Sequence, residues 1–113
     1  MDAIETKLQL VLAESPQVIV WGTGQLAMKL LAETSLAKAQ IVAFVDGNPI
    51  NQGKMLRNVP ILSPEQIRGM SQPIVVTTTL HQQEIADEIY SMALSNKVIL
   101  LSAFGQIFRG KID

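Results

Sequence analysis

The chain has 113 residues, of which 48% are hydrophobic and 17% charged, and its formal net charge at pH 7 is −1. A chain of this length can bury one hydrophobic core, which predicts a single domain over residues 1–113 and excludes a two-domain enzyme. Because a net charge near zero provides no broad positive field for phosphates, we expect no nucleic-acid partner.

The residue types that are missing or rare narrow the function further. There is no cysteine and only one histidine, so we expect neither disulfides nor a metal site, and a reducing compartment is the natural setting. The first fifteen residues do not resemble a signal peptide, and no apolar run approaches the roughly 20 residues that span a bilayer. We therefore expect a cytoplasmic protein without a membrane span.

The first part of the chain is predicted to alternate helices with strands. An apolar stripe at helical spacing predicts an amphipathic helix over residues 3–14. Residues 17–21 form an apolar, β-branched run without alternation, which predicts a strand buried on both faces. A second helical stripe covers residues 25–33, and a second buried strand covers residues 40–45.

A polar stretch then separates the second strand from the third. Residues 47–58 are predicted to form a long loop, a type of connection that often contacts ligands. Residues 59–62 are predicted to form an edge strand, because they include a proline that cannot donate to a central ladder. A short helix is expected to begin after Ser63 and to end near Gly69.

The last part of the chain repeats the alternation. Residues 73–79 are predicted to form the fourth strand, residues 82–94 a regular helix and residues 97–101 the fifth strand. The side chains of this helix that are expected to face the sheet are Ile85, Ile89, Met92 and Ala93.

Five buried strands alternating with helices predict an α/β fold. The sheet is expected to be parallel and doubly wound, with strand order 3-2-1-4-5 and helices on both faces. The remaining residues 103–113 are too few for another βα unit. Their apolar side chains Phe104, Ile107 and Phe108 are expected to contact another surface, in a homo-oligomer or on a catalytic partner subunit.

The sharpest motif is G-x-G-x-x-A, directly after the first buried strand and at the start of a helix. The first glycine permits a tight turn, and the second lets a phosphate approach the backbone, where the amides of the helix start face an anion. The candidate ligand-binding residues of this motif are Gly22, Thr23, Gly24, Gln25 and Leu26. The alternative is a glycine-rich turn that serves only tight helix–strand packing.

Asp46 lies at the end of the second strand, 22 positions after Gly24. A dinucleotide-binding fold places there the carboxylate that accepts hydrogen bonds from ribose, so Asp46 and the nearby Asn48 are candidate cofactor contacts. An acid at this position repels a 2′-phosphate, which favours NAD over NADP. The alternative is an Asx turn in which Asp46 only caps the bend that follows it.

Two cations lie in the predicted loop over residues 47–58, namely Lys54 and Arg57. Either could pair with a phosphate above the first helix terminus, Arg57 in a bidentate fashion and Lys54 as a point charge. The alternative is that both are solvated loop charges.

Hydroxyl side chains and the single histidine follow the fourth strand. Thr77, Thr78 and Thr79 could hydrogen-bond a ribose, a phosphate or a sugar at the carboxyl edge of the sheet. His81 is a weak candidate for proton transfer, because its unperturbed pKa is near neutrality. Without a visible partner, the alternative for His81 is an ordinary residue at the start of a helix.

Several segments together resemble a known family. Residues 18–24, 41–49 and 58–65, with Gly53 between them, resemble the small Rossmann-like nucleotide-binding domain at the front of sugar O-acyltransferases and polysaccharide-biosynthesis nucleotide-sugar dehydratases. A similar module ends some sugar C-methyltransferases. The resemblance implies a nucleotide, nucleotide-sugar or NAD-like ligand over the glycine turn, with Asp46 near its ribose or base.

The same resemblance suggests a function. We expect a nucleotide-binding module for NAD or a nucleotide-sugar in sugar or polysaccharide metabolism, without complete catalytic machinery of its own. One alternative is a subunit or fragment of a sugar-nucleotide oxidoreductase, acyltransferase or methyltransferase. A further alternative is a degenerate interaction domain that forms oligomers and no longer binds nucleotide.

Overall fold

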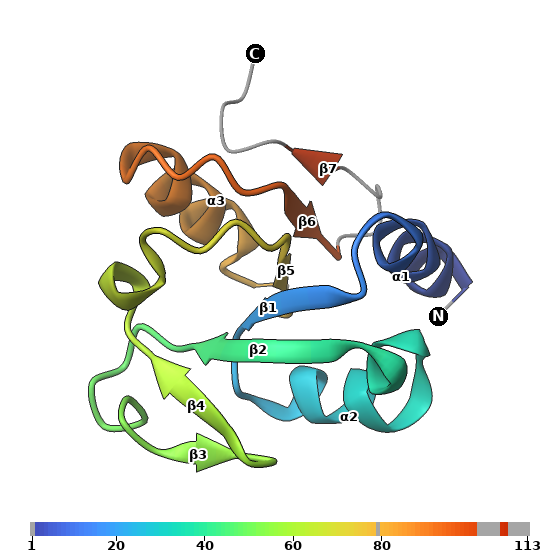
Figure 1. Ribbon diagram of the computed structural model, residues 1–113, viewed down its shortest axis with the longest axis horizontal. Coiled ribbons are helices and arrows are strands. Elements are labelled where there is room, and N and C mark those ends of the chain that lie inside the picture. The colour runs from blue at the N-terminus through green and yellow to red at the C-terminus, as the bar shows by residue number, and fades with distance from the viewer. Residues whose placement is uncertain (1, 79, 102–106, 109–113) are drawn as a thin grey trace.

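Five parallel strands form the centre of the fold in the computed structural model, which describes residues 2–78, 80–101 and 107–108. Along the sheet they run in the order β4, β2, β1, β5 and β6, so the predicted order 3-2-1-4-5 is confirmed (Figure 1). Their bounds are Gln17–Trp21 (β1), Gln40–Val45 (β2), Val59–Leu62 (β4), Ile74–Val76 (β5) and Val98–Leu100 (β6).

Two short antiparallel strands extend the sheet at its edges, and neither was predicted. Strand β3 (Met55–Leu56) lies in the segment predicted to be a loop and pairs with β4, so β4 is not the edge strand. Arg57 and Asn58 connect these strands at positive φ, 52° and 64°, as a two-residue hairpin turn of type I′ requires. Strand β7 (Ile107–Phe108) pairs with β6.

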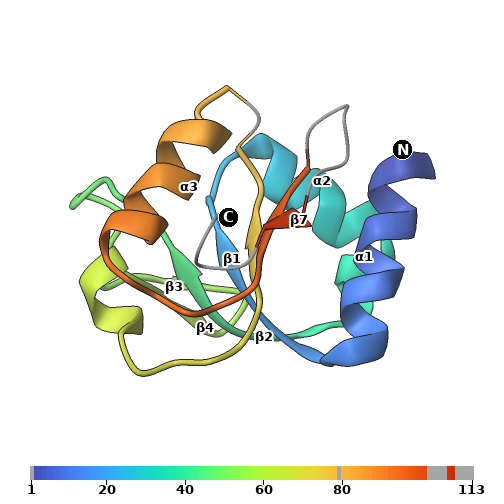
Figure 2. The same cartoon turned by 90° about the horizontal axis from the view of Figure 1, so that it is seen from above.

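The helices cover both faces of the sheet, as predicted. Helices α1 (Asp2–Glu14) and α2 (Gln25–Glu33) lie on one face, together with the 3-10 helix η1 (Ser35–Lys38). Helix α3 (Gln82–Ser91) and the 3-10 helix η2 (Pro64–Ile67) lie on the other (Figure 2). The apolar strands are therefore buried from both sides.

Alternate strand residues enter two separate cores. Val18 and Val20 of β1 pack under α1 and α2, whereas Ile19 and Trp21 pack toward α3 and η2. The same alternation places Val75 of β5 in the first core and its neighbours Ile74 and Val76 in the second. A strand that must fill two cores needs apolar residues at every position, which explains the absence of polar alternation.

Helix α3 ends earlier than residue 94, because Ala93 adopts a left-handed conformation at φ 57°. Its N–H donates to Tyr90 O, and the N–H of Leu94 donates to Ile89 O, the two bonds of a Schellman motif. Ala93 is exposed and does not face the sheet as predicted, whereas Ala86 of the same helix is buried in the core although it was not predicted to be.

Three other elements, η2, β5 and β6, are shorter than predicted. Helix η2 ends at Ile67, and β5 ends at Val76, while Thr79 lies outside the described residues. Strand β6 likewise covers one residue fewer at each end than the predicted 97–101.

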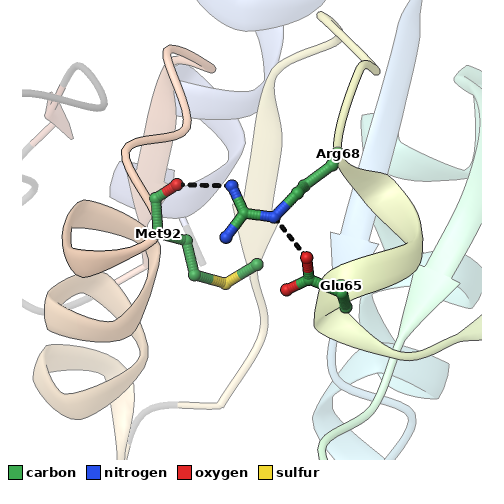
Figure 3. A network of polar contacts seen from close by, with 3 residues as sticks. All are labelled: Glu65, Arg68 and Met92. Atoms are coloured by element: carbon green, nitrogen blue, oxygen red, sulfur yellow. Dashed lines mark hydrogen bonds and ion pairs between the residues drawn. The ribbon is translucent and has the colours of Figure 1, made fainter.

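Arg68 ties η2 to the end of α3. Its Nε donates to Glu65 Oε1 at 2.5 Å, and its Nη1 donates at 2.8 Å to Met92 O (Figure 3). The carbonyls at a helix C-terminus lack partners within the helix, and a cation there also interacts favourably with the helix dipole. This contact joins the C-terminal end of α3 to η2 on the same face of the sheet.

Candidate functional site

A hollow of about 400 Å³ lies where β1 and β2 end, between the β1–α2 turn, the loop after β2 and one side of α3. Open α/β sheets bind ligands at this edge. We call it the carboxyl-edge pocket; its lining residues are Trp21, Gly22, Thr23, Gly24, Val45, Asp46, Gly47, Asn48, Asn51, Thr78, Ile85 and Glu88. A second hollow of about 350 Å³, between α1 and η1, reaches Pro16 just before β1, at the opposite edge.

Gly22 makes the turn tight. Its φ is 123°, and a Cβ placed on it would lie 2.4 Å from Thr77 Oγ1, so no other residue fits without rearrangement. Thr77 is buried, and both its N–H and its hydroxyl donate to Trp21 O, at 2.9 and 3.1 Å. Thr77 thus fastens β5 to the turn, and its side chain does not line the pocket.

Gly24 presents open backbone at the start of α2. It is the N-cap residue, and within the described part of the chain no side chain caps the helix there and no atom would lie within 4 Å of a Cβ placed on it. The first turn, which begins with Gln25 and Leu26, contains no acidic residue that would neutralise the helix terminus. Uncapped backbone N–H groups and the helix dipole together favour an anion at this position.

Asp46 is held by three hydrogen bonds in the pocket wall. Its Oδ2 accepts from Thr23 Oγ1 at 2.5 Å and from Asn51 Nδ2 at 2.8 Å, while its Oδ1 accepts from the Asn48 N–H at 2.8 Å. Burial raises the pKa of Asp46, but these hydrogen bonds favour the carboxylate and hold the pKa below its ordinary value. The bond from Asn48 is the Asx turn that was one of the two interpretations of Asp46.

Some polar and helical residues of the pocket were not among the site residues predicted from the sequence. Asn51 orients Asp46, while Ile85 and Glu88 line the pocket from α3. Their spacing of three residues on a helix that starts at the carboxyl edge of the sheet is the signal that could have found the last two. Thr78, which was predicted, also lines the pocket, and its Oγ1 is buried without a hydrogen-bond partner among the described residues.

Lys54, Arg57 and His81 do not line the pocket. Lys54 is exposed just before β3, and Arg57 borders a separate hollow of about 190 Å³ beside the end of α2. His81 is exposed at the start of α3, with its Nδ1 3.4 Å from Glu84 Oε1. The charged residues that line the pocket, within the described part of the chain, are the carboxylates Asp46 and Glu88.

No group of three or more potential metal ligands occurs among residues 2–78, 80–101 and 107–108. None of the helices in these ranges is long and apolar enough to cross a membrane.

The fold is similar to that of two solved structures. UDP-D-quinovosamine 4-dehydrogenase from Vibrio fischeri is 17% identical, with a TM-score of 0.58 over 86% of this chain and 94% of that one. RSP in complex with β-NADH is 19% identical, with a TM-score of 0.53 over 76% of this chain and 46% of that one. This chain therefore aligns with less than half of RSP. The fold is Rossmann-like.

Comparison with curated proteins gives no match. The protein family described as C2185-like, N-terminal, matches residues 14–100, a segment that begins at the end of α1 and includes all five parallel strands. The chain therefore belongs to the C2185-like, N-terminal family.

Proposed function

We propose that residues 1–113 act as one nucleotide-binding module, which holds NAD or a nucleotide-sugar in the carboxyl-edge pocket. It serves sugar or polysaccharide metabolism without complete catalytic machinery of its own. The observation that carries this proposal is the meeting of an uncapped helix start at Gly24 with the carboxylate of Asp46 in one pocket. The names of the two structural neighbours, a UDP-sugar dehydrogenase and an NADH complex, support the same class of ligand.

The residues present fit such a ligand. A phosphate at the start of α2 would receive hydrogen bonds from free backbone amides, and the open space at Gly24 leaves room for it. A carboxylate can accept about four hydrogen bonds, and the protein supplies three to Asp46, so one position remains for a ribose hydroxyl. The orphaned hydroxyl of Thr78 offers a further polar contact.

The test is ligand binding by wild type and by Gly24→Asp, measured by titration calorimetry with NAD, NADP and UDP-sugars. An aspartate at this position would cap α2 and occupy the anion position, so we expect an intact fold but no binding. The control Ser95→Asp adds the same charge at an exposed residue before β6, at the opposite edge of the sheet. Wild type that binds none of these ligands at millimolar concentration contradicts the proposal.

We also propose that a partner, either a second copy or a catalytic subunit, covers this edge of the sheet. Two large apolar side chains are exposed in the loops beside the pocket, Ile50 at 72% and Leu80 at 85%. Exposed apolar side chains that gather around a site favour contact with another protein. Phe104 lies outside the described residues, as do the side chains of Ile107 and Phe108, so the expected role of the C-terminal tail stays a prediction.

Size-exclusion chromatography with light scattering tests this second proposal. Wild type should form an oligomer, or a complex with a candidate catalytic subunit, that Leu80→Lys disrupts. A monomer that forms no complex would contradict it.

A further inference from the structure

Glu88 is the second carboxylate of the carboxyl-edge pocket, on the wall formed by α3. In the described part of the chain, no hydrogen bond or ion pair joins its carboxylate to a donor. The acidic residues next to it on α3 differ, because Glu84 contacts His81 and Asp87 accepts from Gln83. The side chain of Glu88 is exposed and free to meet a ligand.

The charges around the pocket restrict what can lie beside Glu88. No lysine or arginine of the described residues lines the pocket, so its positive potential comes from the start of α2 at Gly24. Asp46 already accepts three hydrogen bonds from the protein, whereas the carboxylate of Glu88 accepts none from the side chains that the structure describes. A phosphate beside Glu88 would meet an uncompensated negative charge, while a hydrogen-bond donor would meet an acceptor.

We infer that Glu88 is a specificity-determining residue that accepts hydrogen bonds from an uncharged, donor-bearing part of the ligand, opposite the phosphate at Gly24. This inference rests on the proposed nucleotide-binding function. The donor is either an exocyclic amine of the base or a hydroxyl of an attached sugar. Ile85, one turn earlier on the same wall, provides the apolar contact beside it.

The consequence is a pocket with two unlike ends. The end at Gly24 accepts one anionic group, and the end at Glu88 rejects a second one. Ligands in which a phosphate or pyrophosphate is joined to an uncharged base or sugar fit this distribution, as NAD and nucleotide-sugars do. Nucleotides that carry phosphates at both ends do not.

Binding constants of wild type, Glu88→Ala and Glu84→Ala test the inference. Glu84→Ala is the matched control, because it removes the same charge from the same helix at a residue that does not line the pocket. Alanine is the best helix former, so both variants should fold. We expect Glu88→Ala to weaken binding about tenfold more than Glu84→Ala does, the effect of losing one hydrogen bond to a charged group.

The ligand pairs AMP with IMP, and UDP-glucose with UDP, identify the donor. IMP lacks the exocyclic amine of AMP, and UDP lacks the sugar hydroxyls of UDP-glucose. The penalty of Glu88→Ala should disappear for IMP if the amine is bound, or for UDP if the sugar is bound. A penalty equal for both members of each pair, or no excess penalty over Glu84→Ala, overturns the inference. Absence of binding by wild type instead overturns the nucleotide-binding function itself.

Discussion

Replacing Gly22 with alanine is expected to destabilise the fold by about 2–6 kcal/mol. Holding a side-chain-bearing residue at φ 123° costs about 1–3 kcal/mol. The new Cβ would lie 2.4 Å from Thr77 Oγ1 and 3.2 Å from Thr78 Cγ2, and overpacking of this kind costs a further 1–3 kcal/mol, roughly. Thr77 is buried and donates its hydroxyl to Trp21 O, so it cannot move away without losing that bond.

Urea unfolding measures this loss, and Gly24→Ala is the matched control. Gly24 has a negative φ of −86° and open space around its missing side chain, so its replacement should cost only the weaker N-cap preference of alanine, about 1 kcal/mol or less. Thr77→Ala in the Gly22→Ala background should recover part of the loss, because it removes the 2.4 Å contact but not the backbone strain. Equal stability of the two single glycine variants would refute the reasoning.

Three other substitutions test the fold around the pocket. Ala93→Gly should stabilise the chain by about 0.5–1 kcal/mol in urea unfolding, because glycine adopts the left-handed conformation at the end of α3 without strain; no rise in the midpoint would contradict this. Arg68→Met should cost about 0.5–1 kcal/mol, because it removes the bond to Met92 O and the exposed ion pair, and an unchanged midpoint would argue against that contact. The folded pKa of Asp46 is lowered, so its contribution to stability is complete above its ordinary pKa of 3.8 and is lost as the pH falls through the lower folded value. Asp46→Asn should therefore flatten the decline of stability below about pH 4, and parallel pH curves for variant and wild type would rule this out.

The parallel strands could be predicted because their residues fill two cores, and their order follows from the right-handed winding of alternating strands and helices. Ile19 and Val20 enter opposite faces, so residues 18–21 of β1 are all apolar and the run is visible in the sequence. Gly22 was also visible, since the turn between a buried strand and a helix needs its conformation. These features depend on local sequence and on the rules of parallel sheets.

The features that could not be predicted from the sequence depend on long-range contacts instead. Strand β3 has two residues, too few for a periodic pattern, and its partner β4 alone gives it a place in the sheet. Ala93 takes a conformation that glycine usually marks, so its sequence carried no stop signal for α3. Glu88 enters the pocket only because α3 packs beside the ends of β1 and β2, a placement that no local motif encodes.

The two interpretations of Asp46 do not exclude each other. The Asx turn uses Oδ1, and Thr23 and Asn51 share Oδ2, which leaves about one acceptor position of the carboxylate open. The same three bonds hold the carboxylate in one orientation before any ligand arrives, so a ribose hydroxyl would not have to order it. Because Thr23 lies between the two glycines of the turn, the orientation of Asp46 is coupled to the backbone that would receive the phosphate. The hydrogen bond from Thr23 to Asp46 stabilises the turn, and it would also align the phosphate position with the ribose position of a nucleotide site.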